Sequence, residues 1–149
     1  MSATTPREDG KQQTASPGRT NARRKVLYVE DDKDWRELVV GALRDAEYEV
    51  LAARDATEAM LLAEGVRLSA IILDLNLDGE DGLVLMRFFK RNQLDVPIIL
   101  FTGLNHDDDA ILEMLRQGAH QYVRKGPLDA LLNAVRGAIA SSTPAPEAG

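Results

Sequence analysis

The fold is decided by a short stretch, Ala70-Ile71-Ile72-Leu73-Asp74, in which an apolar run ends in a carboxylate. Four apolar side chains in a row, followed by the turn-forming residues 76–82, are typical of a buried central strand that runs out into a loop. Asp74 would then lie at the carboxyl end of that strand. In open α/β sheets ligands bind at this edge, because the loops there form a crevice above the packed layers.

Four further apolar runs accompany this one at nearly even spacing. They cover residues 26–29, 50–53, 97–101 and 121–123, with helical patterns between them. Crossover connections of this length require parallel strands, and right-handed crossovers place helices on both faces of the sheet. The sequence therefore predicts an α/β fold with a doubly wound five-stranded parallel sheet in a three-layer αβα sandwich.

Apolar spacing and end signals mark the helices. The second begins at Asp55, with Glu58 three residues later as in a capping box. The third covers about residues 83–91, the fourth ends at Gly118, and the fifth follows Pro127. The first carries one apolar stripe at helical spacing, made of Trp35, Leu38, Val39, Ala42, Leu43 and Ala46.

Composition limits the class of protein. A chain of 149 residues, 44% hydrophobic and 28% charged, fits one soluble domain with a substantial core. The absence of Cys excludes a disulfide framework, a thiolate metal site and a cysteine nucleophile. No signal-peptide pattern and no membrane-length apolar run is present, so we expect a cytoplasmic protein.

Charge is distributed unevenly along the chain. Residues 1–25 hold six basic and two acidic side chains, which leaves the remainder at −10 within a total of −6. A folded domain with this much negative charge is unsuited to binding the phosphate backbone of a nucleic acid. The Ser, Thr, Pro, Gly and Gln content predicts a disordered basic arm over residues 1–23 and a disordered tail over 141–149, around a folded domain at 24–140.

The ends of the predicted strands carry chemically active side chains. Glu30 and Asp31 follow the first strand, Asp74 the third, Thr102 the fourth and Lys125 the fifth. Clustered carboxylates repel one another unless a cation lies among them, and Mg²⁺ suits such an oxygen ligand set. The ammonium and hydroxyl groups suit the oxygens of a phosphoryl group. Together these residues indicate phosphoryl transfer.

Most of these residues have a structural explanation when taken singly. Asp31 could be an acid at a helix N-terminus, Thr102 a good strand former, Lys125 a solvated charge and Tyr122 a half-buried aromatic. Asp74 differs, because a carboxylate directly after a buried run serves no helix cap. The combination indicates a site more strongly than any member does.

These motifs occur in an order that resembles the receiver domains of two-component response regulators, of the single-domain CheY-like kind. The resemblance covers about residues 24–140 and implies a flavodoxin-like sheet with strand order 2-1-3-4-5. The motifs that carry it are Val29-Glu30-Asp31-Asp32, Ile71-Ile72-Leu73-Asp74 with Asp81-Gly82, Phe101-Thr102-Gly103, and Gly118-Ala119-His120-Gln121-Tyr122-Val123-Arg124-Lys125.

The resemblance implies a phosphoacceptor role for Asp74, with a phosphohistidine on a sensor histidine kinase or a histidine phosphotransfer protein as donor. It implies Mg²⁺ held by Asp31, Asp74 and the backbone carbonyl of Asn76, with Glu30 acting through metal-bound water. Such a domain is a signalling module rather than an enzyme, with at most self-catalysed phosphotransfer and autodephosphorylation.

The resemblance also assigns the switch. Lys125 would pair with the phosphoryl oxygens, Thr102 would hydrogen-bond one of them, and Tyr122 would swing inward. A surface around the fourth helix, fifth strand and fifth helix would then bind a downstream protein target. Neither DNA nor membrane binding is expected of such a domain, which would be a monomer or a phosphorylation-dependent dimer.

Two positions depart from the family pattern. The family generally has Pro, commonly through a cis bond, directly after the lysine, whereas Lys125 is followed by Gly126 and then Pro127. This departure raises the question of where the lysine lies. At Leu77-Asp78 the family often has a hydrophobic residue and Pro, so Asp78 adds charge beside the acceptor.

Three functions remain open at the level of sequence. The favoured one is a stand-alone receiver, since the chain ends shortly after the fifth helix. A receiver-like scaffold that works without phosphorylation is the second. The third is a Mg²⁺-dependent phosphatase with Asp74 as nucleophile, since Asp74-Leu75-Asn76 resembles the signature of haloacid-dehalogenase-like enzymes except that Asn76 replaces its second carboxylate.

Overall fold

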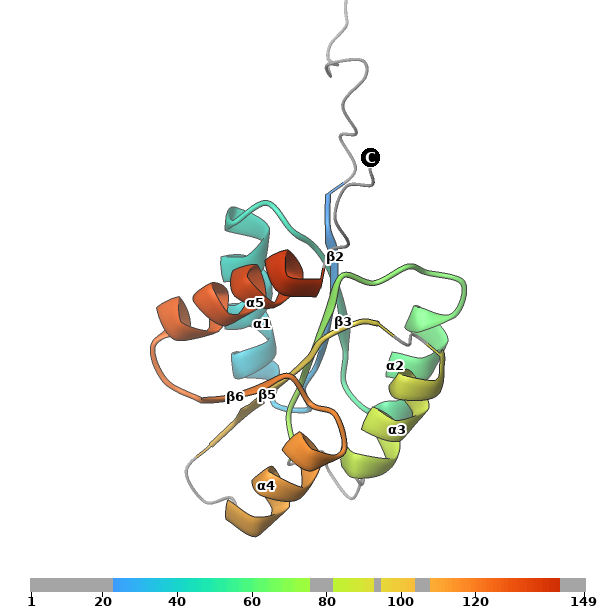
Figure 1. Ribbon diagram of the computed structural model, residues 1–149. Coiled ribbons are helices and arrows are strands. Elements are labelled where there is room, and N and C mark those ends of the chain that lie inside the picture. The colour runs from blue at the N-terminus through green and yellow to red at the C-terminus, as the bar shows by residue number, and fades with distance from the viewer. Residues whose placement is uncertain (1–22, 76–81, 93–94, 104–107, 143–149) are drawn as a thin grey trace, which may run out of the picture.

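The computed structural model describes residues 23–75, 82–92, 95–103 and 108–142. Strands and helices alternate along these ranges (Figure 1). The strands are β2 (Lys25–Val29), β3 (Glu49–Ala53), β4 (Ala70–Leu73), β5 (Ile98–Thr102) and β6 (Gln121–Arg124). The helices are α1 (Lys33–Asp45), α2 (Ala56–Ala63), α3 (Gly82–Asn92), α4 (Asp108–Arg116) and α5 (Leu128–Ser142).

The described strands form one parallel sheet in the order β3-β2-β4-β5-β6. Numbered along the chain this is 2-1-3-4-5, so the predicted flavodoxin-like topology is confirmed. β4 lies at the centre and all four of its residues are buried, as its uninterrupted apolar sequence predicts for a strand covered on both faces.

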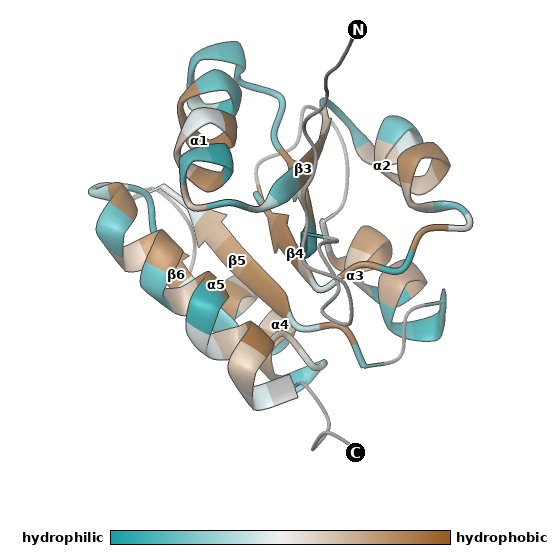
Figure 2. Cartoon of the chain, turned by 90° about the horizontal axis from the view of Figure 1, so that it is seen from above, coloured by the Kyte–Doolittle hydropathy of each residue, from teal (hydrophilic) through white to brown (hydrophobic). Residues whose placement is uncertain are grey.

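Two hydrophobic cores lie on opposite faces of the sheet, because successive strand side chains point to opposite sides. The α1/α5 core includes Tyr28, Ile72 and Phe101 with Val39, Leu43 and the apolar face of α5. The α2–α4 core includes Val29, Leu73 and Leu100 with the inner faces of α2, α3 and α4. Figure 1 shows α1 and α5 on one side of the strands and α2 and α3 on the other, and in Figure 2 β4 and β5 are strongly hydrophobic.

Helix ends follow the predicted signals. Asp55 Oδ1 accepts a hydrogen bond from the Glu58 backbone N–H at 2.8 Å, as expected for a capping box. The reciprocal bond is shifted by one residue, since Glu58 Oε1 accepts from the N–H of Arg54 at 2.7 Å. Gly118 follows α4 with φ of +121°, in the region that favours glycine, and its N–H donates to the Leu115 carbonyl at 3.2 Å.

The predicted apolar stripe of α1 is wrong at Leu38, which is 55% exposed. The helix packs through Val39 and Leu43, with Val40 and Trp35 against the same core, so its buried face is turned away from Leu38. At the other end of the domain, α5 continues to Ser142, two residues into the segment expected to be a tail. The rest of that tail and nearly all of the predicted basic arm lie outside the described residues.

Within the described ranges, no helix has both the length and the apolar character that crossing a bilayer requires.

Replacing the cap of α2 by Asp55→Ala should lower the free energy of unfolding by about 1 kcal/mol, because the amide of Glu58 loses its acceptor. Urea denaturation followed by circular dichroism measures the change. Asp45→Ala, at the last residue of α1 where no N-cap is lost, is the control. Equal stability of the two variants would contradict the capping role.

Candidate functional site

The sheet register brings the ends of β2 and β4 together. Val29 pairs with Leu73, so the next residues, Glu30 and Asp74, leave the sheet side by side. The Asp74 N–H donates to the Val29 carbonyl at 3.2 Å and continues the ladder one step beyond β4. The edge predicted from the sequence thus places two acidic residues next to each other, one from each strand.

The ends of β5 and β6 meet at the same edge. Thr102, the last residue of β5, pairs with Arg124. The N–H of the following residue, Lys125, donates to the Thr102 carbonyl at 2.8 Å. This bond fixes the backbone from which the lysine side chain extends towards β4.

Lys125 connects the two acidic residues. Its Nζ lies 2.8 Å from Glu30 Oε1 and 3.1 Å from Asp74 Oδ2. All described peptide bonds are trans, that between Lys125 and Gly126 included. The lysine therefore reaches the predicted site although Gly126 stands where the family has proline.

Burial and charge act in opposite directions at this edge. Glu30 is 0% exposed and Asp74 2%. Burial raises the pKa of Glu30 to about 7, and the nearby Asp74 also raises it, while hydrogen bonds from Lys125 and Tyr28 lower it. For Lys125, burial alone would lower the pKa, but Glu30 and Asp74 outweigh it and the pKa lies above its usual value.

Oxygens of Glu30, Asp31 and Asp74 lie within 4.8 Å of one another. With all three carboxyl groups ionised and Lys125 protonated, this group carries two excess negative charges. A divalent ion would neutralise it, and Mg²⁺ prefers carboxylate oxygens with several waters retained. The residues present thus fit Mg²⁺, as the sequence predicts. Asn76, the predicted carbonyl ligand, lies outside the described residues.

Thr102 and Tyr122 differ in their surroundings. The Thr102 hydroxyl is fully buried and has no hydrogen-bond partner among the described residues. A buried hydroxyl without a partner lowers the free energy of unfolding, and it can donate a hydrogen bond to an acceptor that arrives beside it. Tyr122 on β6 is half-buried against the α2–α4 core, as the alternation of the strand predicts.

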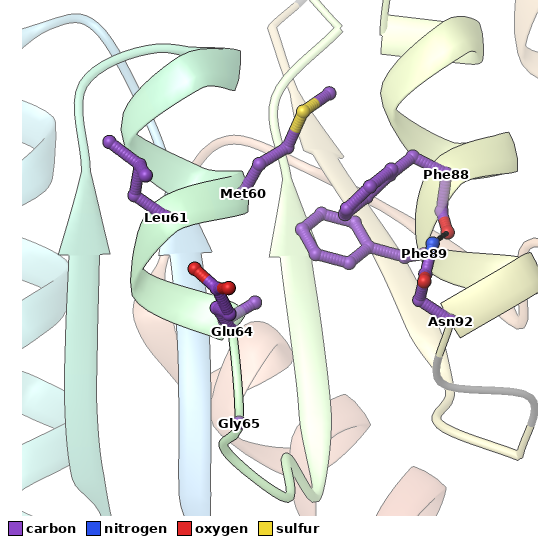
Figure 3. Close-up of a pocket in the computed structure, with 8 residues that line it drawn as sticks. Met60, Leu61, Glu64, Gly65, Phe88, Phe89 and Asn92 are labelled. Carbon is purple, nitrogen blue, oxygen red and sulfur yellow. Dashed lines mark hydrogen bonds between the residues drawn. The ribbon is translucent and has the colours of Figure 1, made fainter.

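A cavity of about 430 Å³ between α2 and α3 is separate from this edge (Figure 3). Its lining includes Glu64 and Gly65 directly after α2 and Asn92 at the end of α3, together with Phe88 and Phe89. Both helices run antiparallel to the strands, so these ends lie away from the acidic edge. The described residues that line the cavity include one carboxylate and no cation, a set that does not suit phosphoryl chemistry.

A comparison with protein families places the chain. The family model for the response regulator receiver domain matches residues 26–136. The chain belongs to this receiver domain family. The resemblance inferred from the sequence motifs is thereby confirmed.

Curated relatives of this receiver domain are response regulators. Transcriptional regulatory protein AruR of Pseudomonas aeruginosa is 40% identical over 138 residues, which cover 83% of this chain and 55% of that protein. PhoB of the same organism is 35% identical, covering 67% of this chain and 44% of that protein. For NtrX of Azorhizobium caulinodans the identity is 33%, and the match covers 67% of this chain and 22% of the relative. The chain thus matches between about a fifth and just over half of the length of these relatives.

Solved structures agree with the fold. The receiver domain of NtrX from Brucella abortus superposes with a TM-score of 0.73 at 28% identity, covering 78% of this chain and 99% of that one. The receiver domain of the Francisella response regulator 1452 has a TM-score of 0.72 at 23% identity and covers 81% of this chain and 100% of its own.

Three residues that support this edge were not identified from the sequence. Tyr28 donates its hydroxyl to Glu30 Oε1 at 2.7 Å, and Arg36 donates to the carbonyls of Glu30 and Asp31. Trp35, expected only as a core residue, lies with its ring centroid 5.3 Å from Lys125 Nζ. Strand alternation could have indicated Tyr28, since residues two apart in a strand share a face.

Mg²⁺ binding should change the fluorescence of Trp35, the single tryptophan of the chain, because its ring contacts the ammonium group that the ion's charge affects. Titration with MgCl₂ gives the dissociation constant. Asp31→Asn should raise that constant at least about tenfold, a loss of about 1.4 kcal/mol, because one carboxylate is removed from the group. Asp34→Asn, an exposed acid of the same helix start, should leave it unchanged. Unaltered affinity in Asp31→Asn would contradict the metal site.

Proposed function

We propose that this receiver domain accepts a phosphoryl group on Asp74 from a phosphohistidine donor, on a sensor histidine kinase or a histidine phosphotransfer protein. An Asp74 carboxylate oxygen attacks the phosphorus, the phosphorus–nitrogen bond of the donor breaks, and the imidazole leaves. The product is an acyl phosphate on Asp74. The observation that carries this proposal is the contact of Lys125 with the buried Asp74 at 3.1 Å, beside the carboxylates of Glu30 and Asp31.

The neighbouring side chains have complementary roles in this proposal. Lys125 holds Asp74 before transfer and pairs with the phosphoryl oxygens after it, since its ammonium group is within reach of the acceptor. The hydroxyl of Thr102 donates to one of these oxygens and so gains a partner. Asp31, Asp74 and, through water, Glu30 would hold Mg²⁺, and the carbonyl of Asn76, which lies outside the described residues, would be a further ligand. When bound, Mg²⁺ neutralises charge that builds up on the transferring group.

The output is a change of a protein-binding surface. Thr102 is adjacent to β6 and pairs with Arg124, two residues after Tyr122. A movement of Thr102 towards the phosphoryl group changes the space beside Tyr122 and, through it, the surface of α4, β6 and α5. A downstream protein binds this surface when it has changed. The domain thus acts as a cytoplasmic signalling module. Two relatives are named as transcriptional regulatory proteins, which supports gene expression as an output of the pathway.

Incubation with acetyl phosphate and Mg²⁺ should add one phosphoryl group to the protein, as measured by intact mass spectrometry. Asp74→Asn should abolish the addition, because the amide is not a nucleophile, and a chelator of Mg²⁺ should prevent it in the wild type. Asp45→Asn, an exposed change at the end of α1, should be phosphorylated normally. No addition with several phosphoryl donors would favour the scaffold function instead.

Thr102→Val should separate stability from switching. The valine removes a buried hydroxyl without a partner, so the free energy of unfolding should stay equal or rise by about 1 kcal/mol. Phosphorylation should still occur, but amide hydrogen exchange in α4 and β6 should no longer respond to it as in the wild type. Thr57→Val, at an exposed position of α2, is the control. A wild-type response in Thr102→Val would exclude the switch role.

A further inference from the structure

Tyr28 is a fully buried side chain with a polar end. It lies on β2, is 0% exposed and packs in the α1/α5 core. Glu30 follows two residues later on the same face, and the Tyr28 hydroxyl donates to its Oε1 at 2.7 Å. Buried hydroxyls are rarely left without a partner, but here the partner is one of the three carboxylates of the acidic group.

The two oxygens of Glu30 are bound unequally. Oε1 accepts from the Tyr28 hydroxyl at 2.7 Å and lies 2.8 Å from Lys125 Nζ. Oε2 accepts from the backbone N–H of Asp32 at 3.3 Å, beyond the usual length of such a bond. Two short, strong donors thus fix Oε1, and Oε2 retains more of its capacity to accept.

Of the two donors to Oε1, Lys125 has a second partner and Tyr28 does not leave Glu30. The ammonium group of Lys125 is shared with Asp74 and, in the proposed function, moves to the phosphoryl oxygens. The proposed function, in contrast, gives the Tyr28 hydroxyl no other partner than Glu30. A phenol is protonated near neutral pH, so the Tyr28 hydroxyl stays a donor to Oε1.

We propose that Tyr28 is a positioning residue of the Mg²⁺ site: its hydroxyl holds Glu30 Oε1, so that Oε2 faces the ion or its bound water. This inference rests on the proposed function and adds a residue to it. Partners that orient a metal ligand in this way affect metal affinity by about 10-fold to 100-fold when they are removed. The bond of Tyr28 remains in place while Lys125 pairs with the phosphoryl group.

The test is Tyr28→Phe, which removes one oxygen and keeps the ring. Isothermal titration calorimetry with MgCl₂ should show an affinity about tenfold weaker than in the wild type. The Mg²⁺ concentration for half-maximal phosphorylation by acetyl phosphate should rise by the same factor, with the rate at saturating Mg²⁺ unchanged. A merely structural role would instead lower that rate or the stability to urea at every Mg²⁺ concentration.

Tyr48→Phe is the matched control, since it makes the same chemical change just before β3, at the opposite edge of the sheet, and should leave Mg²⁺ binding unchanged. Wild-type Mg²⁺ affinity in Tyr28→Phe would overturn the positioning role while phosphorylation of Asp74 still supports the proposed function. If the wild type neither binds Mg²⁺ nor becomes phosphorylated, both proposals fail together.

Discussion

The ammonium group of Lys125 lies between two buried carboxylates, and the rest of this edge depends on that contact. Glu30 and Asp74 are almost fully buried, and two ionised carboxylates so placed would repel each other strongly. Removing one partner from a buried ionic group typically costs about 3–5 kcal/mol, because a charge is then left without compensation. Lys125, within 2.8 Å of one carboxylate and 3.1 Å of the other, makes the arrangement stable.

Several elements hold the lysine in place. Its backbone N–H is bound to the Thr102 carbonyl, which continues the pairing of β5 and β6. Its Nζ also faces the ring of Trp35 from α1, and that ring packs edge-on against Phe101 with centroids 5.6 Å apart. The position of the charge is thus set by the sheet and by the packing of α1, with a trans peptide bond before Gly126.

Much of the fold was predictable because strand ends and helix ends have local signals. The run up to Asp74 predicted the central strand, and the pair Asp55 and Glu58 predicted a helix start. The acidic group was predictable for the same reason, since parallel strands end at one edge. The contacts between layers were not predictable: a stripe at helical spacing does not show that α1 turns Leu38 to solvent, nor that Trp35 meets Lys125. Such facts depend on how layers pack.

The alternation of side chains along the strands divides the site between the two faces of the sheet. Glu30 follows Tyr28 on the α1/α5 side, where Trp35 meets Lys125, whereas Thr102, next to Phe101 of that core, points to the α2–α4 side together with Tyr122. The ion pair of Lys125 with Glu30 therefore lies on the α1/α5 side of the sheet, and the unsatisfied hydroxyl of Thr102 lies on the α2–α4 side. The backbone of the sheet separates these two layers, and Asp74, directly after the central strand, lies at the edge where residues of both layers meet. One residue inserted in β5 would reverse the side-chain parity of both Phe101 and Thr102, so it would disturb the buried hydroxyl together with the contacts that hold Lys125 between its carboxylates.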